Sequence, residues 1–299
     1  MIGCAAASGY RIGEASLATQ GITFEPLAGA LGAEVRGVSL AGLQDEAVWD
    51  AIRRAFLEHM VLVFRDQALS PADQMAVGER FGAPCHYPFV TGMADYPYLF
   101  EIIKEPHETQ NFGGGWHSDT TYLPQPPLAT LLYAIETPSR GGDTLFANTR
   151  AAYDALSEGM RQLIDDLVGV NSAGLKYGGG RSAMHKNIGA MQIHGTDAAD
   201  ALEAEHPVAR THPDTGRKAL YLSRSHTIRF RDLAEEESAP LIAWLQAHQT
   251  RAEFTCRVRW TPGTLTIWDN RCTQHSAIND YHGQRRHMRR LTVGAQTPA

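Results

Sequence analysis

The feature that most constrains the fold is a series of five short β-type runs separated by turn signals. The runs are residues 128–135, 219–222, 254–260, 265–268 and 290–294. Glycine- and proline-containing segments such as 138–142, 213–216 and 261–263 separate them and favour tight turns. Many short strands with a few flanking helices are typical of a jelly-roll-like barrel. We therefore expect a mainly β chain with flanking helices.

Three stretches are predicted to form helices. Residues 45–60 carry Val48, Ile52 and Phe56 at helical spacing and run directly into a β-type segment at 61–64. A second helix opens at Ser70, a favoured N-cap residue, with a proline in the first turn. A third is expected over 150–167.

The segment 171–205 differs from the rest of the chain. It is rich in glycine, alanine and polar residues and shows no clear periodicity. A segment of this kind inside a compact domain is either disordered or a working lid. Since no linker divides the chain, we expect one domain over residues 21–299, with this lid-like insertion. Residues 1–20 are expected to form a loose N-terminal extension.

Composition excludes several classes of partner. The formal net charge is -6 and no long basic stripe is present, which argues against a nucleic-acid partner. The four cysteines include no C-x-x-C pair, and so few in a chain of 299 residues do not make a disulfide scaffold. No apolar run approaches the length of a membrane span. We expect a cytoplasmic protein that acts on a small molecule without a membrane partner.

The sharpest chemical signal is the stretch Gly-Trp-His-Ser-Asp at 115–119. On a strand, residues two apart project from the same face, so His117 and Asp119 can reach one metal ion. An imidazole and a carboxylate are two of the three ligands in the facial triad that leaves three positions of Fe(II) open. By itself an H-x-D pair is a weak signal, because it arises often by chance.

The C-terminal part strengthens the signal. His275 supplies a third ligand, and Arg286 follows it after ten intervening residues. A diacid cosubstrate that chelates iron through its 2-oxo acid end needs a bidentate cation for its remote carboxylate. The hydroxyl of Thr144 can add a hydrogen bond to that carboxylate. Taken together, these elements form a specific signal.

Here the chain resembles the taurine dioxygenase and 2,4-dichlorophenoxyacetate dioxygenase family (TauD/TfdA). The resemblance rests on residues 116–119, 142–144, 268–275 and 285–286, extends to 64–67, 80–82 and 212–217, and spans from about residue 22 to the C-terminus. It implies a double-stranded β-helix (a cupin-like jelly roll) and an oxidoreductase that depends on Fe(II), oxygen and 2-oxoglutarate. It also implies a homo-oligomer, either a dimer or a tetramer.

The resemblance carries roles onto individual residues. The implied iron ligands are His117, Asp119 and His275, and the implied 2-oxoglutarate anchors are Thr144 and Arg286. The implied substrate-binding residue is Arg290, which matches the arginine that binds the anionic head in taurine-type members.

The chain also departs from the taurine enzymes. It has Tyr87 and Val90 where they place a histidine and a tyrosine, glycines at 113–115 where they place an asparagine, and His226 near an aromatic pocket position. We therefore expect Tyr87 and His226 to line the substrate pocket. The expected substrate is a small organic anion other than taurine, such as an aryloxy- or alkyl-carboxylate or a related sulfonate. Its C–H bond is oxidised with release of succinate and CO2. Hydroxylation is the expected outcome, and bond cleavage, desaturation and cyclisation stay open.

Two other functions fit parts of the pattern. A hydrolase could hold zinc on the same three ligands and use water as its nucleophile, but Thr144 and Arg286 would then have no function. A non-catalytic binding module could keep the barrel alone, although it would not need the triad and both anchors.

Overall fold

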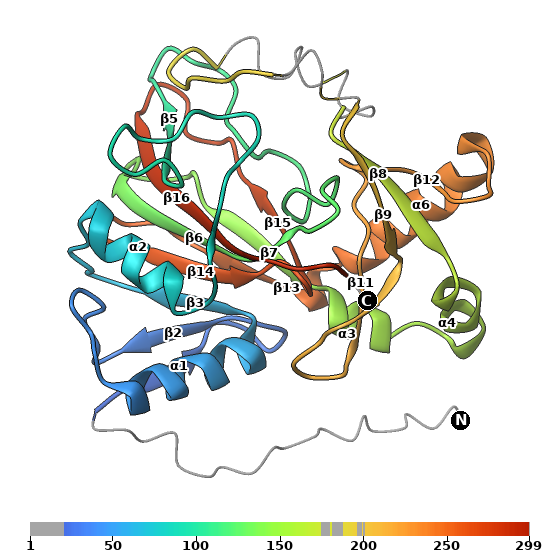
Figure 1. Ribbon diagram of the computed structural model, residues 1–299, viewed down its shortest axis with the longest axis horizontal. Coiled ribbons are helices and arrows are strands. Elements are labelled where there is room, and N and C mark those ends of the chain that lie inside the picture. Colours follow the sequence, from blue (N-terminus) through green and yellow to red (C-terminus); the bar gives the residue numbers. More distant parts are fainter. Residues whose placement is uncertain (1–20, 175–179, 181–187, 196–198, 200, 299) are drawn as a thin grey trace.

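The computed structural model describes residues 21–174, 180, 188–195, 199 and 201–298 (Figure 1). The predicted N-terminal extension lies outside the described residues, as does much of the predicted lid. No helix in the described part of the chain is long and apolar enough to cross a membrane.

Two facing sheets form the barrel. The larger has the strand order β1-β2-β3-β14-β6-β16-β4, with β5 also paired to β16, and the smaller has the order β13-β7-β15. The bounds in the larger sheet are β1 Thr23–Pro26, β2 Ala33–Arg36, β3 Val61–Phe64, β4 Pro84–Cys85, β5 Phe100–Lys104, β6 Pro127–Glu136, β14 Leu265–Asp269 and β16 Arg286–Ala295. Those in the smaller are β7 Thr144–Asn148, β13 Thr255–Val258 and β15 Thr273–Ala277. This mainly β jelly roll confirms the predicted fold class.

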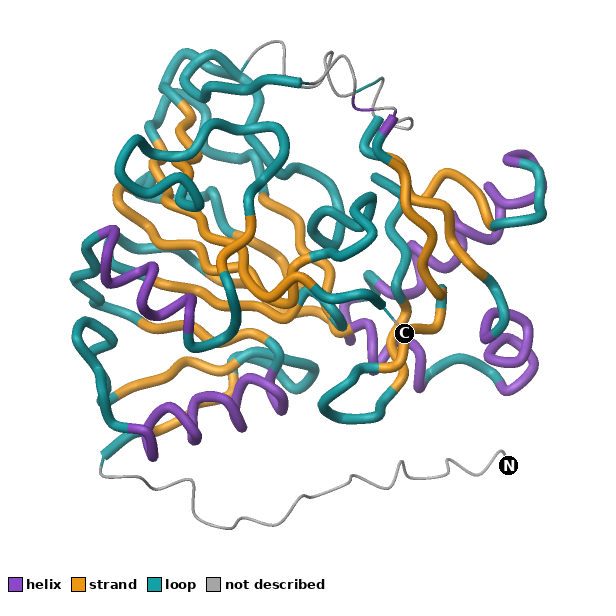
Figure 2. The backbone as a smooth tube through the Cα atoms, in the orientation of Figure 1, coloured by secondary structure: helices purple, strands orange, loops and turns teal. Residues whose placement is uncertain are grey.

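The remaining elements cover the two sides of the barrel (Figures 1 and 2). Helices α1 Glu46–His59 and α2 Pro71–Glu79 lie beside the larger sheet. On the other side are α3 Thr149–Asp154, α4 Glu158–Asp165, α6 Glu235–Gln249 and the short 3-10 helix Ala252–Phe254. Two further small sheets, β12-β8-β9 and β10-β11, accompany them, with bounds β8 Val168–Ser172, β9 Glu203–Pro207, β10 Ala209–Thr211, β11 Lys218–Leu220 and β12 Thr227–Phe230.

The first two predicted helices are confirmed, and their ends follow from capping. Asp45 accepts hydrogen bonds from the backbone N–H groups of residues 47 and 48, and α1 ends where Met60 adopts a φ of 63°. Ser70 and Asp73 form a capping box at the start of α2.

The prediction of one helix over 150–167 was wrong, because the segment forms α3 and α4. The side chain of Ser157 accepts from the N–H of Met160 and starts the second helix. Helix α6 was missed altogether in a region expected to be largely strand-like. It begins where Glu237 accepts a hydrogen bond from the N–H of Ala234. Its buried side includes polar side chains such as Gln246, so the sequence shows no clear apolar stripe.

The turn between β14 and β15 carries a buried ionic network that positions the strand holding His275. Arg271 binds the Asp269 carboxylate in a bidentate manner at 2.8 and 2.7 Å, and His212 Nε2 lies 3.0 Å from the same carboxylate. The side chains of all three are about 1% exposed. Burial opposes ionisation of Asp269, but its hydrogen bonds to Arg271 and His212 bring its pKa below the usual value.

We predict that Arg271→Met destabilises the protein by about 3–5 kcal/mol, because the buried carboxylate loses its cation. Urea unfolding measures the change. The matched control is Arg217→Met, since Arg217 pairs with Asp154 where both side chains are more than half exposed. That variant should lose no more than about 1 kcal/mol. Equal losses in the two variants would contradict a structural role for the buried network.

Candidate active site

The two candidate histidine ligands are held together by the backbone. His117 forms an isolated antiparallel bridge with His275 of β15, with N–H to O distances of 3.0 and 2.8 Å. Asp119 was expected on a strand with His117, and this was wrong. The bridge is a single residue long, and Asp119 lies in a turn in which Thr120 has a φ of 45°.

The three candidate ligands nevertheless converge on one point. Asp119 Oδ1 lies 3.7 Å from the Nε2 atoms of both His117 and His275, and the three ligand atoms lie within 4.8 Å of one another. His117 Nδ1 is 2.9 Å from the carbonyl oxygen of Gly115. When Nδ1–H donates to that oxygen, the lone pair of Nε2 faces the carboxylate, as a metal ligand requires.

Asp119 is a buried carboxylate that is kept ionised by its neighbours. Its side chain is 3% exposed, and Arg290 Nη2 lies 2.6 Å from Oδ1. The hydroxyl of Thr130 donates to Oδ2 at 2.7 Å and in turn accepts from the amide of Asn270 at 2.9 Å. Burial favours the neutral acid, but Arg290 and the histidines hold the pKa of Asp119 well below its usual range.

His275 is kept neutral by its surroundings. Burial, and then the proximity of His117, lower the pKa of His275 well below its usual value, and Asp119 only partly opposes them. Neutral imidazoles and an ionised carboxylate are the protonation states that bind a divalent metal.

The donor set fits Fe(II). Two imidazole nitrogens and one carboxylate on one side of a point are the facial arrangement of non-haem iron oxygenases. A second cluster in the described residues, His212, Asp269 and Cys272, does not fit a metal. Its carboxylate is already bound on both oxygens by Arg271, and burial raises the pKa of the Cys272 thiol to about 12. A metal there would have to displace a guanidinium.

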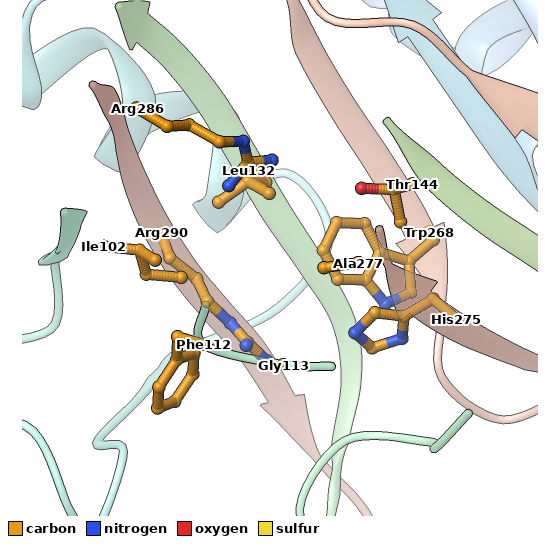
Figure 3. A pocket seen from close by; sticks show the side chains of 10 residues that line it. All are labelled: Ile102, Phe112, Gly113, Leu132, Thr144, Trp268, His275, Ala277, Arg286 and Arg290. Carbon is orange, nitrogen blue, oxygen red and sulfur yellow. The ribbon is translucent and has the colours of Figure 1, made fainter. Parts of the chain in front are cut away.

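A cavity opens beside the triad (Figure 3). Both Arg286 and Arg290 reach it from β16, as their even separation predicts. Thr144 of β7 and Trp268 of β14 lie across from them. The full lining is Ile102, Phe112, Gly113, Leu132, Thr144, Trp268, His275, Ala277, Arg286 and Arg290.

The two candidate anchors of the cosubstrate share a neighbour that the sequence did not reveal. Arg286 is 5% exposed, and neither its Nε nor its Nη2 meets an acceptor in the described residues. Trp260 lies with its ring centre 5.7 Å from the Arg286 guanidinium and donates from Nε1 to the Thr144 hydroxyl at 3.0 Å. Because the Thr144 oxygen accepts this hydrogen bond, its own hydroxyl proton can be donated to another group. Trp260 follows β13 in the chain, and the pairing of β13 with β7 brings it to Thr144.

Aromatic rings surround Arg290. The rings of Tyr87 and Phe100 each lie 5.7 Å from its guanidinium carbon, and Phe112 packs edge-on against Tyr87. Sequence reasoning selected Tyr87 but missed both phenylalanines, although Phe112 directly precedes the glycines at 113–115.

His226 is placed differently from Tyr87. It is 5% exposed, its Nδ1 lies 3.0 Å from the Thr121 hydroxyl, and its ring lies 6.0 Å from that of His117. Neither His226 nor Tyr87 is among the described residues that line the cavity. The structure therefore brings Tyr87 to Arg290 and His226 to His117, a candidate iron ligand.

Comparison with known proteins agrees with this geometry. Residues 23–292 match the family model for taurine catabolism dioxygenase TauD, TfdA family. The chain belongs to the TauD/TfdA family. An alpha-ketoglutarate-dependent sulfate ester dioxygenase of Pseudomonas putida is 36% identical over 282 residues, covering 91% of this chain and 89% of the relative. The (S)-phenoxypropionate/alpha-ketoglutarate-dioxygenase of Sphingobium herbicidovorans is 32% identical, covering 84% and 88%.

Solved structures agree as well. The crystal structure of a taurine dioxygenase from Burkholderia xenovorans has a TM-score of 0.78 at 31% identity and covers 93% of this chain and 91% of its own. This TauD/TfdA chain is thus an oxidoreductase, a dioxygenase that uses Fe(II), 2-oxoglutarate and O2. Neither the zinc hydrolase nor the non-catalytic module is favoured.

We predict that His275→Ala weakens metal binding by more than about 100-fold, because a lost ligand costs more than the 10- to 100-fold lost with its supporting groups. Anaerobic titration with Fe(II) or Mn(II), followed by calorimetry, measures this. His287→Ala is the control, since His287 pairs with Glu101 rather than with the triad. Unchanged affinity in His275→Ala would place the metal elsewhere.

Proposed function

We propose that His117, Asp119 and His275 hold Fe(II), that Arg286 and Thr144 hold the remote carboxylate of 2-oxoglutarate, and that Arg290 holds the anionic group of the substrate. One observation carries the proposal: β16 presents two buried guanidinium groups to the cavity that His275 also lines. Arg286 Nε and Nη2 meet no acceptor in the described residues, and Arg290 pairs with Asp119 Oδ1, an atom that a bound metal ion would take. With iron in place, both guanidinium groups would therefore need an anion.

Bound iron and 2-oxoglutarate supply the oxidising chemistry, in which 2-oxoglutarate yields succinate and CO2 while a substrate C–H bond is oxidised. The protein's part is to bind and orient. Arg286 offers a planar, bidentate donor set to a carboxylate, and Thr144 adds a hydroxyl donor on the opposite side. Leu132 and Trp268 line the space between them and exclude water.

The surroundings of Arg290 support a proposal for the substrate class. The guanidinium supplies charge complementarity, while Tyr87, Phe100 and Phe112 supply apolar surface next to it. We therefore propose an organic anion with an apolar or aromatic body, namely an aryloxy- or alkyl-carboxylate or a related sulfonate. The names of the relatives, a sulfate ester dioxygenase and a phenoxypropionate dioxygenase, support an organic anion of this kind.

The expected dimer or tetramer and the cytoplasmic location stay predictions. Light scattering on the purified protein tests the first. The division into one domain with a lid-like insertion also stays a prediction.

We expect Arg286→Gln to raise the dissociation constant for 2-oxoglutarate by at least about 30-fold, because a buried carboxylate that loses its cation costs about 2–5 kcal/mol. Calorimetry with the Mn(II) protein measures it. Arg285→Gln is the matched control, since the adjacent Arg285 pairs with Glu105 and Glu136 outside the cavity. A larger effect in Arg285→Gln would move the anchor to that residue.

For the substrate site, Arg290→Gln should raise the Michaelis constant for an anionic substrate by a similar factor, about 30-fold or more. Succinate formation with a panel of aryloxy acids, alkyl acids and sulfonates identifies the substrate and measures the effect. Slow decay of 2-oxoglutarate without substrate should continue in the variant. A substrate that proves neutral or cationic, or an unaltered Michaelis constant, would overturn the assignment of Arg290.

A further inference from the structure

The register of β5 against β16 places a lysine beside the candidate cosubstrate anchor. Phe100 is paired with Arg290 at one end of β5, and Lys104 is paired with Arg286 at the other. Phe100 contacts Arg290, and Ile102 lines the cavity. Because alternate residues of a strand face the same side, Lys104 continues this inward face at the Arg286 end.

Lys104 is a buried cation without a hydrogen-bond acceptor. The residue is 3% exposed, and no acceptor in the described part of the chain reaches Nζ. Its Nζ lies over the Tyr281 ring, 4.5 Å from the ring centre. Burial lowers the pKa of Lys104, and the charge of Glu108 opposes this only in part.

Glu108 is committed to other donors. Its Oε2 accepts from the N–H of Glu105 at 2.7 Å, and its Oε1 accepts from the N–H groups of Gly189 and Ala190 at 2.5 and 3.1 Å. No ion pair within 4 Å joins it to Lys104 among the described residues. The ammonium group of Lys104 can thus donate hydrogen bonds, but it donates none to a described residue.

Two such groups stand next to each other. Arg286 also has Nε and Nη2 without an acceptor in the described residues. Residues directly opposite on antiparallel strands have Cβ atoms about 4.5–5.5 Å apart. Lys104 lies over the Tyr281 ring. Burial raises the pKa of Tyr281, and the charge of Arg286 opposes this rise. Burial costs each of these cations hydration that no described acceptor replaces, so the arrangement is unfavourable until an anion binds beside them.

We propose that Lys104 is a second cation for the remote carboxylate of 2-oxoglutarate, binding it together with Arg286. This rests on the proposed function, in which Arg286 holds that carboxylate. One carboxylate has enough lone pairs for a guanidinium, an ammonium and the Thr144 hydroxyl. The pair would select a dicarboxylic 2-oxo acid against a monocarboxylic one of the same length.

The test compares two ligands in two proteins. 2-Oxopentanoate has a methyl group where 2-oxoglutarate has its remote carboxylate and keeps the same iron-chelating end. Calorimetry with the Mn(II) protein, by competition where binding is weak, gives both dissociation constants. Lys104→Met keeps the apolar stem and removes the charge. We expect it to weaken 2-oxoglutarate by about 10- to 100-fold, the worth of one hydrogen bond to a charged group, and to leave 2-oxopentanoate unchanged.

Melting temperature separates binding from structure. If Lys104 serves the ligand, Lys104→Met should melt no lower than the parent, because removing an uncompensated buried charge is neutral or stabilising. Equal weakening of both ligands together with a lower melting temperature would assign Lys104 a packing role and overturn the proposal. So would unchanged affinity for 2-oxoglutarate. Lys104→Gln provides the same comparison if the methionine variant does not fold.

Arg286→Gln distinguishes failure of this inference from failure of the proposed function. If Arg286→Gln weakens 2-oxoglutarate and Lys104→Met does not, the carboxylate lies where proposed and only the role of Lys104 is wrong. If neither substitution weakens 2-oxoglutarate, the carboxylate binds elsewhere and both assignments are wrong.

Discussion

The buried carboxylate of Asp119 is the group on which the arrangement of the site depends. An ionised carboxylate that is 3% exposed needs positive charge close by. Arg290 provides that charge at 2.6 Å, in an ion pair that lacks the alignment of a hydrogen bond. The oxygen concerned, Oδ1, is also the one that faces both histidines. A metal ion and Arg290 are therefore partners for the same atom.

This shared atom links the metal site to the substrate site. A divalent ion among the three ligands would satisfy Asp119 and leave Arg290 available to an external anion. Binding of the metal and binding of the anionic substrate would then be coupled through the Asp119 carboxylate. The substrate would not need to contact Asp119 itself. The aromatic rings of Tyr87 and Phe100, each 5.7 Å from the guanidinium carbon, would stabilise the charge of Arg290 with either partner.

The predictions that succeeded from sequence rest on local chemistry. The start of α2 at Ser70 and the inward direction of Arg286 and Arg290 follow from capping and from the two-residue period of a strand. The convergence of His117 with Asp119 was expected for the wrong local reason, because Asp119 lies in a turn rather than on a strand.

What the sequence could not provide depends on long-range pairing. Lys104 and Arg286 are 182 residues apart and meet only because β5 pairs with β16. Trp260 reaches Thr144 only because β13 pairs with β7. Helix α6 was missed because tertiary contacts, not an apolar stripe, bury residues such as Gln249, whose amide donates to the carbonyl of Leu222.

The most direct test of the central claim is the anomalous X-ray signal of Mn(II) in crystals grown with Mn(II) and 2-oxoglutarate. The account predicts one strong peak within coordination distance, about 2.0–2.2 Å, of His117 Nε2, Asp119 Oδ1 and His275 Nε2, with the remote carboxylate of 2-oxoglutarate at Arg286. A peak at His212, Asp269 and Cys272, or a carboxylate bound away from Arg286, would contradict it.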